Sequence, residues 1–233
     1  MNSTTTKDAP LINRSSYQPW QVLVLFGASG TGKSTAARQI ARASGATWTQ
    51  VDDLRLALQY SRVTLAEMTD RLYFFETTPE FWTRPVDDLL QAFVDVAKVM
   101  VPAVRVVIDS HLVTGVPMVI EGDGVLPSLV DDPVLRPWVD AGVLRFCCLA
   151  ARSSAELIEN MVRRGRGDHL EDQERIALQA NANLAFNDWL VEASRALRIP
   201  VVVSRPFDTL TDRIEQAITS ASHPVGPRDP RMW

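Results

Sequence analysis

The sequence feature that most constrains the fold is a glycine-rich segment, residues 27–34, which reads Gly-Ala-Ser-Gly-Thr-Gly-Lys-Ser. It follows an apolar run at 22–26 and precedes a helix-forming run at 34–42. The segment matches GxxxxGK[ST], in which glycines let backbone N–H groups approach a polyphosphate. The N-terminus of the following helix adds positive partial charge. Strand, loop and helix in this order predict a nucleoside triphosphate site.

The motif also predicts which residues contact the nucleotide. Lys33 is expected to reach the β- and γ-phosphates as a catalytic cation, and Ser34 to offer its hydroxyl to Mg²⁺. ATP and Mg²⁺ are therefore the expected cofactors. The expected nucleotide-binding residues of the loop are Gly27, Ala28, Ser29, Gly30, Thr31, Gly32, Lys33, Ser34 and Thr35.

Composition narrows the class of protein. A chain of 233 residues, 46% hydrophobic and 22% charged, has room for one α/β domain and is short for two. The net charge of −4 gives no reason to expect nucleic acid as a partner. No apolar stretch approaches the roughly 20 residues of a membrane span. Cys147 and Cys148 are adjacent, so a disulfide between them would be strained. Buried free thiols are expected, and they fit a cytoplasmic location.

Apolar runs and helical spacing alternate along the chain. An α/β fold of three layers is predicted, with five parallel strands and helices on both faces of the sheet. The predicted strands are 22–26, 47–51, 117–122, 144–149 and 200–204. The predicted helices are 34–42, 53–60, 64–76, 87–100, 102–113, one beginning at Ser153 with Glu156 in the capping-box position, 172–197 and 210–221. Pro102 is expected to separate two of these helices.

The chain divides into one domain and two tails. Residues 1–18 are expected to be a flexible segment and 223–233 a tail, with a kinase-type domain at 19–222. Within that domain we expect a helical insert at about 56–115 that binds an acceptor molecule. A lid is expected at about 160–171.

Acidic residues follow two of the predicted strands. Parallel sheets bind ligands at the carboxyl ends of their strands, so these acids should lie beside the phosphate loop. Glu121, at the end of strand 117–122, is expected to hold Mg²⁺ through its water shell. Asp123 would share that shell or contact the acceptor. The alternative for Glu121 is an exposed acid in a turn.

The segment after strand 47–51 offers a base and a cation. Asp52 is expected to accept the proton of an acceptor hydroxyl. Arg55 could bind an anionic acceptor, and Asp53 either contacts the acceptor or caps a helix that begins at Leu54. The expected acceptor-binding set is thus Asp52, Asp53, Arg55, Glu121 and Asp123.

Two arginine-bearing segments could contact the triphosphate. Arg163, Arg164 and Arg166 surround Gly165, and a glycine-flexed turn of this kind could close over the nucleotide. Arg163 and Arg166 are the expected catalytic cations, with Arg163 also binding the nucleotide. A solvated basic helix end is the competing interpretation. Arg205, in Arg205-Pro206-Phe207, is expected at the base pocket, although a plain turn would look the same.

An aromatic cluster follows the second predicted strand. It could line an acceptor pocket, and packing of a helical insert explains it equally well. Its members are Tyr60, Tyr73, Phe74, Phe75, Phe81 and Trp82.

Taken together, these motifs resemble the small P-loop kinases of the nucleoside-monophosphate-kinase type. Within them the chain is most similar to 2-phosphoglycerate kinases and to chloramphenicol phosphotransferase-like kinases. The resemblance covers most of residues 20–220, through Gly27–Ser34, Val51–Arg55, Ile120–Gly122 and the arginine cluster. It implies a sheet in the order 2-3-1-4-5 and Asp52 as the base. A histidine expected soon after the glutamate-glycine pair is absent, since the run continues Asp123-Gly124-Val125.

The resemblance and the residues together predict an ATP- and Mg²⁺-dependent kinase. Its acceptor would be a 2-phosphoglycerate-like metabolite, or a hydroxyl of an antibiotic or nucleoside. The alternatives are a nucleotide-dependent switch acting on a protein partner and a binding-only relative. Neither nucleic acid nor membrane is an expected partner, and a homodimer is one option for assembly.

Overall fold

The computed structural model describes residues 20–61, 69–163 and 170–221. Its sheet has five strands, all parallel, in the order β2-β3-β1-β4-β5. This confirms both the predicted sheet and the strand order that the resemblance implied. The strands are β1 (Val22–Phe26), β2 (Thr47–Gln50), β3 (Met118–Gly122), β4 (Leu144–Ala150) and β5 (Val201–Val203).

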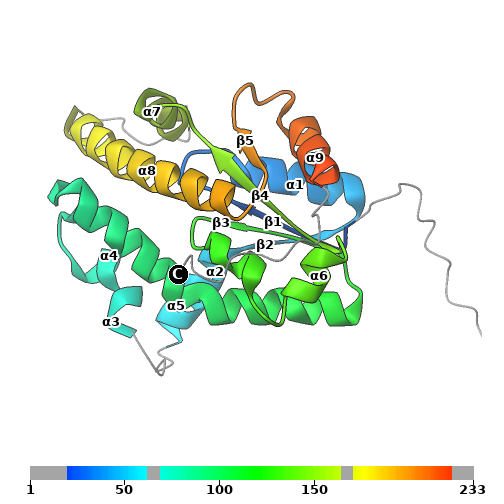
Figure 1. Ribbon diagram of the computed structural model, residues 1–233. Helices are drawn as coiled ribbons and strands as arrows, with labels where there is room; N and C mark the ends of the chain where they lie inside the picture. Colours follow the sequence, from blue (N-terminus) through cyan, green and yellow to red (C-terminus); the bar gives the residue numbers. More distant parts are fainter. Residues whose placement is uncertain (1–19, 62–68, 164–169, 222–233) are drawn as a thin grey trace, which may run out of the picture.

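Helices cover both faces of this sheet (Figure 1). The helices α1 and α9 lie on one face, and α5 and α8 lie side by side on the other. The α-helices are α1 (Lys33–Ser44), α2 (Val51–Tyr60), α3 (Thr69–Leu72), α4 (Phe74–Thr77), α5 (Val86–Thr114), α6 (Arg136–Asp140), α7 (Ser154–Arg163), α8 (Leu170–Ala196) and α9 (Leu210–Ser220). Two 3₁₀ turns, η1 (Phe81–Thr83) and η2 (Pro127–Asp131), complete the described elements.

The central strand shows why its sequence is apolar throughout. Val22, Val24 and Phe26 of β1 join the core beneath α5 and α8. Leu23 and Leu25 point to the opposite face, toward α1 and α9. A strand buried on both faces has no solvent side, so its residues do not alternate with polar ones.

The two cysteines of β4 follow the same alternation. Cys147 belongs to one core and Cys148 to the other, and both are buried and free. The predicted absence of a disulfide between them is thus confirmed. Burial raises the pKa of the Cys148 thiol to about 11, which keeps it protonated at neutral pH.

One predicted helix boundary is wrong. Pro102 does not separate two helices, because α5 runs without interruption from Val86 to Thr114. A proline inside a helix removes one backbone hydrogen bond. Here the apolar face continues across it, with Met100 and Val104 fully buried in the same core, and packing of that face keeps the residues on both sides of the proline in one helix.

A second boundary shifts by two residues. Strand β2 ends at Gln50, and α2 begins at Val51 rather than at Asp53. Val51 is 1% exposed, and its burial fixes the first turn of α2 against the sheet. Asp52 and Asp53 therefore lie inside that turn, where the positive helix end favours carboxylates. Asp53 is not the cap, since the N-cap position is held by Gln50.

Several predictions fall outside the described residues. These are the two terminal segments, residues 64–68 of the helix predicted at 64–76, and the centre of the predicted lid at 164–169. Across the three described ranges, no helix has the length and apolar character needed to cross a bilayer.

Candidate functional site

The phosphate loop connects β1 to α1 and passes very close to its neighbours. A Cβ atom on Gly27 would lie 2.2 Å from the carbonyl oxygen of Leu149 in β4. Gly32 is the N-cap of α1 at φ 82°, and a Cβ there would lie 2.8 Å from the Phe207 ring. Neither position has space for a side chain, so the glycines of the motif are required by the fold of the loop itself.

Lys33 lies beneath this loop. Its side chain is 7% exposed, and its Nζ donates a hydrogen bond of 3.0 Å to the Ala28 carbonyl. The Thr31 hydroxyl donates to the same carbonyl at 2.9 Å. The loop is thus closed on itself around Ala28, and a buried ammonium group lies within it.

Glu121 faces the first turn of α1. It is 3% exposed, and its carboxylate lies near the Ser34 side chain, which acts to lower its pKa. Burial raises the pKa of Glu121, while the positive charge of Lys33 and the Ser34 side chain oppose that rise. The two residues predicted to serve Mg²⁺, Ser34 and Glu121, therefore lie near each other.

Asp52 comes from the neighbouring strand end, because Gln50 pairs with Glu121 across β2 and β3. The negative charge of Asp123 raises the pKa of Asp52, and burial raises it further. Arg55 and Lys33 act in the opposite direction. The Asp52 Oδ1 lies 3.4 Å from Nη2 of Arg55, whose Nη1 donates to Gln59 at 3.3 Å.

A cavity of about 310 Å³ opens beside these groups. Its polar lining comes from the phosphate loop, the start of α2, the segment after β3, and α8. These residues are Ser29, Asp52, Arg55, Asp123, Gln179 and Asn183. Four of the predicted site residues, Ser29, Asp52, Arg55 and Asp123, thus meet in one cavity. Asp53 is exposed and lies outside the lining.

The aromatic cluster divides between the two interpretations left open by the sequence. Phe75, Phe81 and Trp82 line the cavity. Tyr73 instead donates from its hydroxyl to the Gln59 carbonyl at 3.0 Å, and Tyr60 is 76% exposed. Part of the cluster is therefore pocket lining and part is structure of the insert.

Helix α8 contributes polar groups that the sequence reasoning missed. The Ser29 N–H donates to Oδ1 of Asn183 at 3.2 Å, while Nδ2 of Asn183 donates to the Gln179 carbonyl at 2.8 Å. Asn187 accepts from the Ala151 N–H at 2.8 Å and donates back to the Ala151 carbonyl at 3.2 Å. The available signal was the four-residue spacing of Gln179, Asn183 and Asn187, which places three amides on one helix face.

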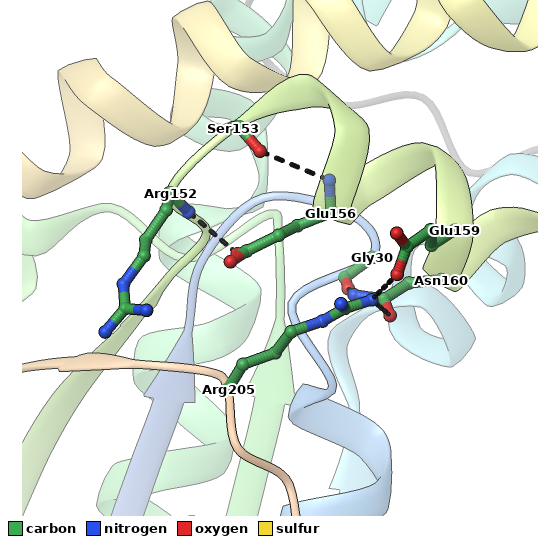
Figure 2. A network of polar contacts seen from close by, with 7 residues as sticks. All are labelled: Gly30, Arg152, Ser153, Glu156, Glu159, Asn160 and Arg205. Atoms are coloured by element: carbon green, nitrogen blue, oxygen red, sulfur yellow. Dashed lines mark hydrogen bonds and ion pairs between the residues drawn. The ribbon is translucent and has the colours of Figure 1, made fainter.

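Arg205 is connected to the phosphate loop through α7, as Figure 2 shows. Its Nη2 lies 2.6 Å from the Glu159 carboxylate and 3.0 Å from Oδ1 of Asn160. Asn160 in turn donates to the Gly30 carbonyl at 2.8 Å. The Arg205 guanidinium also lies 5.8 Å from the centre of the Phe207 ring. The sequence reasoning identified Arg205 but not Asn160, which is 6% exposed.

The start of α7 is stabilised by side chains, as the capping-box spacing predicted. The Ser153 hydroxyl accepts from the Glu156 N–H at 3.3 Å, and the Glu156 carboxylate accepts from the Arg152 N–H at 2.9 Å (Figure 2). The helix ends at Arg163, an exposed residue. Arg164 and Arg166 lie outside the described residues, so their predicted contacts with the nucleotide remain predictions.

Two oxygen donors are available for a divalent cation. In the part of the chain that the structure describes, no three His, Cys, Asp or Glu side chains form a metal-binding group. The Ser34 hydroxyl and the Glu121 carboxylate are nevertheless hard oxygen ligands that lie near each other. Mg²⁺ takes few protein ligands and completes its shell with water and phosphate, so this pair fits the ion.

No protein-family model matches the sequence. The chain is similar to the 2-phosphoglycerate kinase of Methanopyrus kandleri, with 26% identity over 208 residues. This match covers 85% of the chain and 61% of the relative, so the chain spans only part of that protein's length. It confirms the resemblance that the motifs predicted.

Solved structures of two small-molecule kinases also match the chain. A gluconokinase from Sinorhizobium meliloti 1021 has a TM-score of 0.48 and 18% identity, covering 86% of this chain and 92% of its own. A shikimate kinase from Acinetobacter baumannii, in complex with shikimate, has a TM-score of 0.44 and 12% identity, covering 86% and 91%. At this level of similarity these structures carry no argument about the site.

Proposed function

We propose that the chain is an ATP- and Mg²⁺-dependent kinase that transfers the γ-phosphoryl group to a hydroxyl of a small-molecule acceptor. The observation that carries this proposal is the shared cavity, in which Ser29 of the phosphate loop and the Asp52 carboxylate line the same space. The similarity to a 2-phosphoglycerate kinase supports it. The expected cytoplasmic location belongs to the same proposal, because ATP is abundant there and the cysteines are free thiols.

In this proposal the phosphate loop, Gly27 to Ser34 with Thr35, binds the triphosphate. Its closed form around Ala28 positions the N–H groups at the start of α1, whose partial positive charge suits an anion. Lys33 balances the negative charge that the transfer develops. Arg205, which is joined to the loop through Asn160, is proposed to contact the nucleotide.

Asp52 is the proposed base. The acceptor O–H bond breaks as its proton passes to the Asp52 carboxylate, and the acceptor oxygen forms a bond to the γ-phosphorus. The bond from the γ-phosphorus to the β–γ bridging oxygen breaks, and ADP leaves. The raised pKa of Asp52 makes its carboxylate a better proton acceptor than an ordinary aspartate.

Ser34 and Glu121 would hold Mg²⁺, which would supply positive charge beside the phosphates when bound. Asp123 lies on the same side of the sheet, and its proposed part is to raise the pKa of Asp52 and to contact the acceptor. Arg55 holds the Asp52 carboxylate from the other side.

Transfer of the terminal phosphate of labelled ATP–Mg²⁺ tests the proposal. The acceptors would be a pool of phosphoglycerates, nucleosides, sugars and aromatic alcohols. Labelled acceptor is expected with the wild type, with a rate lower by about 10²-fold or more in Lys33→Ala and Asp52→Asn. Asp88→Asn is the matched control, because Asp88 is an exposed carboxylate in the first turn of α5 and is not among the residues that line the cavity. Release of free phosphate alone, dependent on Lys33 and indifferent to Asp52, would point instead to a nucleotide-dependent switch.

A further inference from the structure

The cavity beside the phosphate loop is strongly aromatic beyond its polar end. Its rings come from α4, η1, α5 and α8, of which α5 and α8 lie side by side on one face of the sheet (Figure 1). Phe75 contacts Phe93 with ring centres 5.1 Å apart, and Phe93 stacks on Phe186 at 5.2 Å and 18°. The remaining apolar lining residues are Val51, Phe81, Trp82, Leu89, Val96, Met100 and Ala182.

The polar end of the cavity is more acidic than basic. Among its described lining residues, two carboxylates, Asp52 and Asp123, accompany one guanidinium, Arg55. That guanidinium already contacts Asp52 and Gln59. An acceptor that carries a phosphate and a carboxylate would bring further negative charge to a lining whose one guanidinium is already engaged, while the neighbouring Lys33 is bonded within the phosphate loop. The added anion would need a cationic partner of its own, so this lining disfavours such an acceptor.

The cavity is the size of a small-molecule site. Its volume of about 310 Å³ lies at the lower end of the range for such sites, which runs from roughly 300 to 1,000 Å³. One aromatic ring with a short polar chain fits this space. Stacked phenylalanines at the wall favour a planar body, since rings pack face to face or edge to face with other rings.

Resting on the kinase function proposed above, we infer that the acceptor is an uncharged or cationic hydroxyl compound with a planar, apolar body. Its hydroxyl lies between Ser29, Asp52 and Asp123, where the phosphate loop and the base meet. Its body lies against Phe75, Phe93 and Trp82. The site thus selects against phosphoglycerates, the acceptor class in the name of the similar protein.

Two matched pairs of probes test this inference by calorimetry, with the non-hydrolysable analogue AMP-PNP and Mg²⁺ bound to the full chain. The pairs are phenyl β-glucoside with glucose 6-phosphate, and 1-phenyl-1,2-ethanediol with 2-phosphoglycerate. In each pair the aromatic member is expected to bind about tenfold more tightly or better. Tighter binding of the phosphorylated members, or no saturable binding of either aromatic probe, would overturn the inference.

Two variants distinguish a ring that binds the acceptor from a ring that only packs within the protein. Phe75→Leu removes a ring that lines the cavity. Phe74→Leu removes a neighbouring ring whose centre lies 5.1 Å from that of Phe75 but which does not line the cavity. Phe75→Leu should weaken the binding of the aromatic probes about five- to tenfold, whereas Phe74→Leu should bind them as tightly as the wild type does. Trp82→Leu gives a second test should Phe75→Leu fold poorly by its melting temperature. Equal effects of Phe74→Leu and Phe75→Leu would contradict a pocket.

The same probes distinguish this inference from the kinase proposal. Label transferred from ATP to 2-phosphoglycerate would keep the kinase and overturn the inferred acceptor class. Aromatic probes that bind the cavity but receive no label would support the cavity's chemistry and count against a kinase. Label on the aromatic hydroxyl, lost in Asp52→Asn, supports both.

Discussion

The two ends of the site are built in different ways. The phosphate end is one continuous segment, Gly27 to Thr35, with backbone geometry closed on a single carbonyl. The acceptor end draws on α2, α4, η1, α5, the segment after β3, and α8. Ser29 and Asn183, which join the two ends by a hydrogen bond, are 154 residues apart. A continuous motif is easily recognised in a sequence, whereas a cavity assembled across the whole chain is not.

The two ends should also respond differently to substitution. At the phosphate end the main chain itself lacks space, so small changes should cost stability and nucleotide binding together. At the acceptor end side chains surround an open cavity, so changes there should alter specificity before stability. The expectations that follow examine this difference, beginning with the largest effect.

Gly27→Ala should be the most damaging single change. The added Cβ meets the Leu149 carbonyl oxygen at 2.2 Å, a clash with main chain that cannot move aside. Overpacking combined with strain is expected to cost about 3 kcal/mol, lowering Tm by roughly 6–12 °C. Gly115→Ala is the control, because Gly115 also has positive φ but no atom within 4 Å of the added Cβ. Thermal unfolding that shows equal losses in both variants would contradict the account of the loop.

Asn160→Ala should separate nucleotide binding from acceptor binding. It removes the amide that joins the Gly30 carbonyl to Arg205, leaving buried groups unpaired at a cost of about 1–3 kcal/mol (Figure 2). We expect the KM for ATP to rise several-fold while the KM for the acceptor changes little. The control is Arg152→Ala, because Arg152 enters the same network through its backbone N–H and has an exposed side chain. An acceptor KM that rises as much as that for ATP would show that the two ends are not separable here.

Asn183→Ala should affect both ends, since Asn183 lines the cavity and accepts from the Ser29 N–H. The lost hydrogen bond is expected to cost about 1 kcal/mol of stability. Initial-rate kinetics should show higher KM values for both ATP and acceptor. Asn181, an exposed residue on the same helix, provides the matched substitution Asn181→Ala. If the two variants behave alike, the Ser29 contact has no functional part.

Glu121→Gln should stabilise the protein without nucleotide while impairing its use of Mg²⁺. Burial raises the folded-state pKa of Glu121 above its ordinary 4.5, so the folded state binds this proton more tightly than the unfolded state. Stability therefore falls as pH rises from about 4.5 through the raised pKa, and the neutral glutamine avoids that loss. At pH 7 we expect a Tm higher by about 2–4 °C, corresponding to ~1 kcal/mol. The gain in Tm should shrink as the pH is lowered toward 4.5. A gain that is constant with pH would contradict a raised pKa of Glu121 in the folded state.

Sequence reasoning reached the sheet and the phosphate loop because each depends on local pattern, and the family resemblance supplied the strand order. The run 22–26 is apolar throughout, as a strand buried on both faces requires. Glycines 27, 30 and 32 belong to one short motif, and each has a positive φ. It also placed Asp52, Arg55 and Asp123 near the loop, because parallel strands end at a common edge.

Sequence reasoning failed where packing between elements overrides the local preference of a residue. Pro102 has the local character of a helix start, yet the buried face on either side of it keeps α5 continuous. Asn160, Asn183, Phe93 and Phe186 were missed because each resembles an ordinary helix residue. Only the meeting of α5, α7 and α8 with the loop gives these side chains their contacts.

The pH dependence of phosphoryl transfer, measured for the wild type and for Asp123→Asn, tests the central claim that the groups from separate strands act as one centre. The base must be ionised, so kcat should fall as the pH drops through the raised pKa of Asp52. Because the charge of Asp123 is the main cause of that raised pKa, Asp123→Asn should move the acidic limb of the profile to lower pH. An acidic limb that stays in place would contradict the assignment of Asp52 as the base and its coupling to Asp123.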